Sequence, residues 1–440
     1  MKFKFFIGFI VFVSLVTAVF SQEVKTSPTQ NPVVVLRATP YASPTPSSRV
    51  VVTNNLPAPR STPSPAIQNQ SLPKTSATPV QIYPPPSTTV VPAPVVSPTF
   101  FKPLSFKLIK SKIEEAKRQM IARPVQTALT DSFLETDVIR IAFYDYTTAK
   151  VDYLVTTKSS FLQTDSDINT ISSSGKPFTI RVVRANGVNT PVMIIDAQNL
   201  AHLPLLVQYP VEKNGRLTET AYYISTHPGI VTPEVVNAGK IYVRNTLDTA
   251  RANLLQKGVF ISPQVADAAE RLSIVEHVDH DRFRSEYAPN IFNDIYALYA
   301  LNEGQTYRYS VSSAGAGGMV QMIPSTYYMI RSRYYNAALI PDFVEGMRNH
   351  VNAATAMLLY MQMTWSDLIS NETIYDAVQN GVATPAELMS AGYNSNPAKL
   401  PAYIKRGGGS WKNLIPRETQ IYLQINAAMD RFVPVIPRTK

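Results

Sequence analysis

The sequence contains no cysteine, and this absence excludes several classes of protein. Without a thiol the chain cannot have a disulfide framework, a thiolate metal site, a cysteine nucleophile or the modified cysteine of a lipoprotein. It also lacks any dense run of lysine or arginine, although its net charge is +10 and its five histidines are scattered. We therefore expect no nucleic-acid partner, despite the basic balance.

The N-terminus has the pattern of a secretory signal. Lys2 and Lys4 precede an apolar run from Phe5 to about Phe20, so we expect a signal peptide over residues 1–21 that is cut before Gln22. The alternative is an uncleaved membrane anchor, because the run is nearly long enough to span a bilayer. We expect an exported protein of a bacterial periplasm or cell wall. The membrane is a partner only if the segment is retained.

Residues 22–104 form a segment rich in proline, serine and threonine. About half of the 35 prolines fall there, including Pro84-Pro85-Pro86. Proline removes backbone donors and the segment has little apolar surface to bury, so we expect a disordered, polyproline-type linker. Such a segment is either a stalk that carries a domain into a thick polymer layer or a passive tail.

Residues 105–231 are expected to hold a basic helix and a small antiparallel β domain. Ser105 to Ala122 has apolar residues at helical spacing among lysines and arginines, and we expect this helix to pack on the following domain rather than on a membrane. From Asp137 to Ser225 the runs are β-branched and aromatic, with Asn186-Gly187 and Asn214-Gly215 placed as hairpin turns. Nothing in this part converges as a catalytic set. It either recognises a ligand or envelope protein partner or only supports its neighbour.

Residues 232–440 are predicted to be helical almost throughout. Thr232-Pro233 and Ser262-Pro263 each have the sequence of a helix start, with a capping side chain before a proline. The expected fold is therefore multidomain, with a disordered linker, a small β domain and an α-helical C-terminal domain.

Glu303 is the candidate catalytic residue of this helical part, because of its position at the end of an apolar segment. It follows the apolar segment through Ile295, Leu298 and Leu301, and a glycine-rich stretch begins twelve residues later at Gly315. The helix dipole and apolar neighbours both disfavour a negative charge at the end of a helix, and a protonated carboxyl is what a general acid requires. The glycines would let backbone approach a substrate closely. The alternative is an ordinary exposed glutamate at a helix end.

The same stretch resembles the catalytic core of the soluble-type lytic transglycosylases, which are related to goose-type lysozymes. Their signature is E-S-x-x-x-x-x-x-x-S-x-x-G-A-x-G-L-M-Q, and the chain matches it without a gap at Glu303, Ser312, Gly315, Ala316, Gly318 and Gln321. Residues 391–397 resemble the family's A-x-Y-N-A-G-P motif, and residues 418–422 resemble its E-T-x-x-Y motif. The resemblance covers roughly residues 262–430.

This resemblance implies a lysozyme-like fold and cleavage of the β-1,4 bond between N-acetylmuramic acid and N-acetylglucosamine in the glycan strands of peptidoglycan. Glu303 would be the single general acid and base, and the muramic C6 hydroxyl would close onto C1 to give a 1,6-anhydro sugar. No cofactor and no metal are implied. The residues that the resemblance assigns to substrate binding are Ser312, Gln321, Tyr393, Met319, Thr326 and Asn394. For Ser312, Gln321 and Tyr393, the alternative role is to satisfy backbone groups of the glycine-rich loop.

Four positions depart from the family pattern, and two alternatives follow. Gly304 replaces a serine, Val320 and Ile323 replace methionines, and Asn396 replaces a glycine. Gly304 and Asn396 favour a glycan-binding scaffold that no longer cuts. A hydrolytic muramidase is the other alternative, if a second acid such as Glu418 reaches a water molecule. The two histidines of residues 276–281 are expected to belong to a polar helix end rather than to a metal site.

Overall fold

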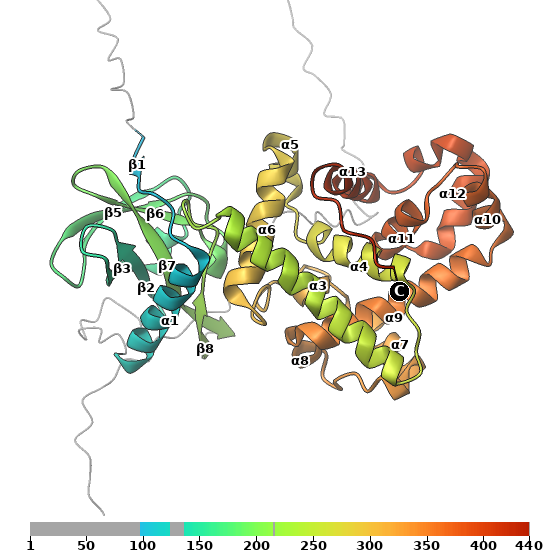
Figure 1. Ribbon diagram of the computed structural model, residues 1–440, viewed down its shortest axis with the longest axis horizontal. Helices are drawn as coiled ribbons and strands as arrows, with labels where there is room; N and C mark the ends of the chain where they lie inside the picture. Colours follow the sequence, from blue (N-terminus) through green and yellow to red (C-terminus); the bar gives the residue numbers. More distant parts are fainter. Residues whose placement is uncertain (1–96, 124–135, 214–215, 440) are drawn as a thin grey trace, which may run out of the picture.

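The computed structural model describes residues 97–123, 136–213 and 216–439, and it has a curled antiparallel sheet beside a mostly helical C-terminal region (Figure 1). The predicted signal peptide and most of the predicted linker lie outside the described residues. The end of the linker, however, was predicted wrongly. Thr99 and Phe100 form strand β1, and the Phe101 ring stacks on Tyr146 with 4.5 Å between ring centroids. These aromatic contacts bring residues 99–101 into the fold.

The described part of the chain forms an eight-stranded sheet with the order β3-β2-β7-β6-β5-β4, and β1 and β8 also pair with β7. The strands are β1 (Thr99–Phe100), β2 (Val138–Asp145), β3 (Lys150–Thr157), β4 (Asp167–Ile171), β5 (Pro177–Val182), β6 (Val192–Asp196), β7 (Leu200–Lys213) and β8 (Arg216–Tyr223). The sheet is curled, and its two end strands, β3 and β4, come into contact. The Ser173 N–H, just after β4, donates to the Tyr153 carbonyl of β3 at 2.9 Å.

The two predicted hairpins have different outcomes. β5 and β6 are antiparallel neighbours, but residues 183–191 join them and contain a 3-10 helix, η1 (Gly187–Asn189), so the tight turn predicted at Asn186-Gly187 is wrong. β7 and β8 pair with Lys213 opposite Arg216. The intervening Asn214-Gly215 lies outside the described residues. β3 and β4 are strands that the sequence did not indicate.

Helix α1 (Phe106–Ala122) packs on the sheet, as predicted. Its N-cap Ser105 accepts a hydrogen bond from the Leu108 N–H, and its four buried residues are Ile109, Ile113, Ala116 and Met120. They join a buried cluster with residues of β2, β7 and α6. All eight residues of β2 are buried, because α1 covers one face of the sheet and the rest of the core covers the other.

The helical region follows β8. Its helices are α3 (Pro233–Gln256), α4 (Pro263–Val275), α5 (His280–Ser285), α6 (Ala288–Asn302), α7 (Pro324–Arg333), α8 (Phe343–Arg348), α9 (His350–Ile369), α10 (Glu372–Gln379), α11 (Pro385–Asn394), α12 (Leu400–Gly407) and α13 (Arg417–Phe432). Short helices are α2 (Lys158–Phe161), η2 (Gly318–Val320), η3 (Tyr335–Ala337), η4 (Pro397–Lys399) and η5 (Gly408–Asn413). The helix starts predicted at Pro233 and Pro263 are confirmed, with Thr232 and Ser262 as the caps.

Helices α3 and α6 cross unusually closely. A Cβ atom on Gly239 of α3 would lie 1.9 Å from the Tyr296 carbonyl oxygen of α6, so only glycine permits this contact. Figure 1 shows α3 as the long helix that leads from the sheet into the helical region. The packing of α6 on α3 fixes the direction in which the end of α6, and hence Glu303, points.

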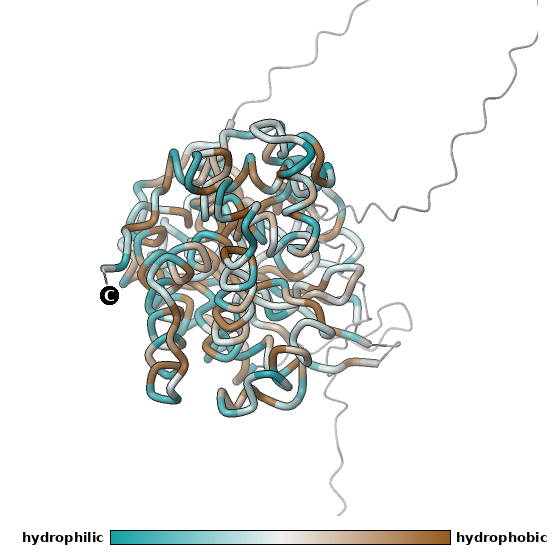
Figure 2. The backbone as a smooth tube through the Cα atoms, turned by 90° about the vertical axis from the view of Figure 1, so that its right-hand side faces the viewer, coloured by the Kyte–Doolittle hydropathy of each residue, from teal (hydrophilic) through white to brown (hydrophobic). Residues whose placement is uncertain are grey.

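The sheet and the helices share a buried core. Asn302 at the end of α6 joins them, since its side chain accepts from the Ile224 N–H at 2.9 Å and donates to the Ile224 carbonyl at 2.8 Å. One hydrophobic cluster contains Ile139 and Val207 of the sheet together with Leu272 of α4. Figure 2 shows hydrophobic and hydrophilic residues alternating along the tube, and none of the described helices is both long and apolar enough to cross a membrane.

Candidate active site

Glu303 lies at the end of helix α6, as the sequence predicts. The helix runs to Asn302, and Glu303 is its C-cap. The side chain is 54% exposed, and its Oε1 accepts a hydrogen bond from Nζ of Lys110 on α1 at 2.8 Å. The apolar surroundings that we expected for this carboxyl are therefore wrong. The buried face of α6 ends at Asn302, and the next side chain is in contact with solvent and with Lys110.

A chain of hydrogen bonds anchors the turn that follows Glu303. The Gly304 N–H donates to the Tyr242 hydroxyl at 2.7 Å, and this hydroxyl donates to His350 Nδ1 at 2.8 Å. His350 Nε2 donates to the Thr306 carbonyl at 3.0 Å. Because a carbonyl only accepts, the imidazole is neutral with its proton on Nε2, and burial lowers the pKa of His350 to about 4. These bonds hold residues 304–306 between α3 and α9.

The glycine-rich stretch folds as a tight loop. The Ser312 N–H donates to the Ala316 carbonyl at 2.8 Å, and the Ala316 N–H donates back to the Ser312 hydroxyl at 3.0 Å. The Gln321 amide donates to the Gly318 carbonyl at 2.9 Å. Gly318 has φ of +67°, and a Cβ there would lie 2.5 Å from the Met347 carbonyl oxygen. The observed bonds of Ser312 and Gln321 thus serve the loop, which was the alternative role for both.

Five of the predicted substrate-binding residues line one pocket of about 320 Å³ beside this loop. They come from stretches as far apart in the sequence as Ser312 and Asn394, and helices α7, α9 and α11 bring them together. The five residues are Ser312, Gln321, Thr326, Tyr393 and Asn394. Glu303 is not among the residues that line this pocket.

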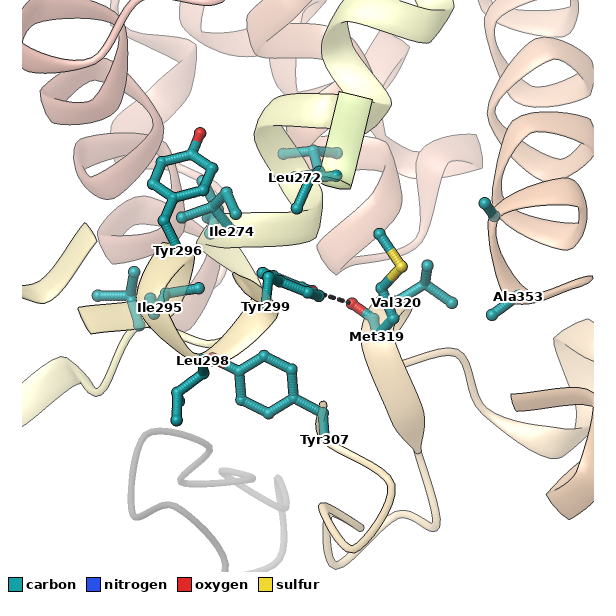
Figure 3. Close-up of a cluster of buried hydrophobic side chains, with 14 of the residues drawn as sticks. Leu272, Ile274, Ile295, Tyr296, Leu298, Tyr299, Tyr307, Met319, Val320 and Ala353 are labelled. Carbon is teal, nitrogen blue, oxygen red and sulfur yellow. Dashed lines mark hydrogen bonds between the residues drawn. The ribbon is translucent and has the colours of Figure 1, made fainter. Parts of the chain in front are cut away.

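Met319 does not line the pocket either. Its side chain is fully buried, and Figure 3 shows it with Val320 between Tyr299 of α6 and Ala353 of α9. The Tyr299 hydroxyl donates to the Met319 carbonyl at 3.4 Å, and His277 Nε2 lies 2.9 Å from the same oxygen. Met319 is therefore a core residue that ties the loop to α6.

Tyr393 and Asn394 hold the wall of the pocket together. The Tyr393 hydroxyl donates to the Val320 carbonyl at 2.7 Å, and the Asn394 side-chain oxygen accepts from the Thr419 hydroxyl at 2.8 Å. These bonds connect α11 to the glycine-rich loop and to α13. The Tyr393 hydroxyl, which the resemblance assigns to substrate binding, thus satisfies a backbone carbonyl of the loop.

Six residues of the lining were not predicted as site residues, and Glu418 and Tyr360 are among them. Glu418, named above as a possible second acid, is the acidic residue of the lining. Tyr360 of α9 packs edge-on against Tyr393, with 5.8 Å between ring centroids. The closing motif at residues 418–422 was the signal that could have identified Glu418. Nothing in the sequence pairs Tyr360 with Tyr393, because they lie on different helices.

The departures from the family pattern have local explanations. Gly304 has φ of +63°, a left-handed conformation that favours glycine over serine. Asn396 has φ of −79°, which any residue adopts, and its side chain accepts from the Ala398 N–H at 3.0 Å. Val320 is fully buried in the core, whereas Ile323 is 37% exposed and lines the pocket. Of the four residues, Ile323 is the one that lines the pocket.

The histidines of residues 276–281 lie on separate elements. His277 follows α4 and stacks on Tyr307, with 3.4 Å between ring centroids, whereas His280 begins α5. Over residues 97–123, 136–213 and 216–439, no group of three or more histidine, aspartate or glutamate side chains is arranged to hold a metal ion. In comparisons with known proteins, no family model, curated protein or solved structure matches the chain.

Proposed function

We propose that this chain is a peptidoglycan lytic transglycosylase whose helical region has a lysozyme-like fold. The observation that carries the proposal is the pocket, because residues from separate motifs of the resemblance meet there. Ser312, Gln321 and Thr326 belong to the first motif, and Tyr393 and Asn394 belong to the second. A chance match of short motifs gives no reason for these positions to share one pocket.

In the proposed reaction Glu303 is both acid and base. Its carboxyl gives a proton to the bridging oxygen as the bond from muramic C1 to that oxygen breaks. The C6 hydroxyl of the same sugar then attacks C1 and returns its proton to the carboxylate, so that the 1,6-anhydro product forms without water. The side chain must leave Lys110 to reach a glycan strand bound along the pocket. An exposed ion pair of this kind costs at most about 1 kcal/mol to separate.

Two alternatives each have one observation in their favour. A hydrolytic muramidase is favoured by Glu418, because it places a carboxylate other than Glu303 in the pocket, and activation of a water molecule requires a second carboxylate. A glycan-binding scaffold is favoured by the contact of Glu303 with Lys110 and by its absence from the pocket lining. The experiment below separates the three.

The measurement is mass spectrometry of soluble fragments released from purified peptidoglycan by the full chain and by Glu303→Gln. Exposed Glu372 of α10 offers the matched control Glu372→Gln. We expect 1,6-anhydro fragments from the wild type and the control, and none from Glu303→Gln. Reducing-end fragments would instead make the enzyme a muramidase. Binding to peptidoglycan without release by any of the three proteins would leave the scaffold.

The proposal includes export to a bacterial periplasm or cell wall, where glycan strands are the partner. The sheet would then support the helical region or bind an envelope protein. Its shared core with α3 and α4 favours support. Fractionation of cells that express the full chain would test export, and recovery of the chain in the cytoplasm would contradict it.

A further inference from the structure

A second cavity lies between the sheet and helix α6. Its lining shares no residue with the pocket described above, although the Gln321 amide of that pocket donates to the Ser310 hydroxyl of this cavity at 3.5 Å. It has a volume of about 260 Å³. The connection between β5 and β6 contributes Arg184 and Asn186, α6 contributes Ile295 and Leu298, and the segment after α6 contributes Ser310. The proposed reaction uses none of these residues.

Arg184 is the unusual group in this cavity. In the part of the chain that the structure describes, its guanidinium makes no hydrogen bond and has no carboxylate within 4 Å, although it is only partly exposed. Arg282, the other arginine of the lining, donates hydrogen bonds to the carboxylates of Glu286 and Asp294, each at 2.7 Å. Burial, and then the charge of Arg282, lower the pKa of Arg184, while the more distant carboxylates of Asp294, Glu286 and Asp279 oppose this shift. A guanidinium in this position is stabilised by an anion that brings its own acceptors.

The rest of the lining restricts which anion fits. Asp279 and Asp294 also line the cavity, and they would repel a doubly charged phosphate more than a singly charged carboxylate. The side chain of Asn186 makes no hydrogen bond in the described part of the chain and can pair with a peptide group. Ile295 and Leu298 provide an apolar wall. The volume suits a dipeptide or the end of a longer chain.

We propose that this cavity binds the carboxylate end of a short peptide. The carboxylate pairs with the fork of Arg184, the last peptide group lies by Asn186, and an apolar side chain lies against Ile295 and Leu298. A planar, bidentate pair is the arrangement that arginine forms with carboxylates. The proposal does not depend on the proposed transglycosylase activity, because it uses a different cavity and other residues.

The test is isothermal titration calorimetry of the full chain with N-acetyl-alanyl-alanine and with the C-terminal amide of the same peptide. We expect the acid to bind at least about tenfold more tightly than the amide, because a charge-assisted hydrogen bond is lost. Arg184→Met is expected to weaken binding of the acid by the same factor. Arg333→Met, which removes an exposed arginine of α7, is expected to leave it unchanged.

The thermal unfolding midpoint of Arg184→Met serves as the control that the variant folds. Because Arg184 makes no hydrogen bond or close ion pair with the residues that the structure describes, Arg184→Met is expected to melt no lower than the wild type. Equal affinity for acid and amide, or an unchanged affinity in Arg184→Met, would overturn the proposal. Tighter binding of inorganic phosphate than of the peptide acid would also overturn the proposal, as would a wild type that does not bind the acid.

Discussion

Gly304 illustrates how a single residue adapts the proposed active site. The family pattern has serine there, but φ of +63° strains any residue with a Cβ atom. We expect Gly304→Ser to lower the free energy of unfolding by about 1 kcal/mol. Urea denaturation would measure this, and Gly304→Asn should lose less because asparagine tolerates the conformation. An unchanged midpoint in Gly304→Ser would contradict the assigned turn.

Lys110 is the residue that holds Glu303 in the structure. If Glu303 must leave this contact to act, Lys110→Met should raise the rate of peptidoglycan cleavage by up to about fivefold, which corresponds to about 1 kcal/mol. Release of soluble fragments measures the rate. Lys107→Met removes another exposed lysine of α1 and should change little. A lower rate in Lys110→Met alone would mean that the lysine assists Glu303.

The sequence predicted part of the site at this scale and missed part. The spacing of the signature predicted that Ser312 and Gln321 lie in the glycine-rich loop. This was predictable because both are held there by hydrogen bonds to residues a few positions away. It could not distinguish Met319, whose side chain enters the core while its neighbours line the pocket. The contact of Glu303 with Lys110 joins residues 193 positions apart, and no local pattern encodes it.

Among the elements, helices α3 and α4 are connected by ion pairs of Arg438, near the C-terminus. Arg438 is 4% exposed and pairs with Asp248 at 2.7 Å, Asp267 at 2.8 Å and Glu270 at 2.7 Å. Arg438→Met would leave three carboxylates close together, so we expect a loss of about 2–4 kcal/mol in the free energy of unfolding. Exposed Arg431→Met of α13 is the control. If Arg438→Met loses no more free energy of unfolding than Arg431→Met, the ion pairs of Arg438 contribute little to stability.

Elements were predictable where their pattern was strong. The four buried residues of α1 and the capped starts of α3 and α4 follow directly from spacing and from proline. Strand β4, Asp167–Ile171, is a short polar strand at the end of the sheet, and β1 lies among prolines. Both form because a neighbouring strand offers backbone partners, which composition does not reveal.

For the whole molecule, two buried histidines predict a loss of stability in acid. They are His227, in the connection between β8 and α3, and His350, at the start of α9. His227 accepts from the Val192 N–H at 3.1 Å, and burial lowers its pKa to about 3, as it lowers that of His350 to about 4. The unfolded chain takes up protons near pH 6.5, before the folded chain does. Stability therefore falls as the pH drops below 6.5, and it continues to fall to about pH 3 for His227 and to about pH 4 for His350.

Each histidine should contribute about 1.4 kcal/mol per pH unit in this window. Urea midpoints between pH 7 and pH 5 measure the dependence. In the double variant His227→Gln and His350→Gln the slope should become markedly shallower, whatever the stability at pH 7. A slope equal to that of the wild type would mean that other groups cause the acid sensitivity.

The central claim is that the whole chain cuts glycan strands with Glu303 and without water. Digestion of peptidoglycan in water enriched in ¹⁸O, followed by mass spectrometry of the new fragment ends, tests it most directly. The account predicts anhydro ends that carry no ¹⁸O, and no new ends with Glu303→Gln. Ends that carry ¹⁸O, or new ends that persist in Glu303→Gln, would contradict it.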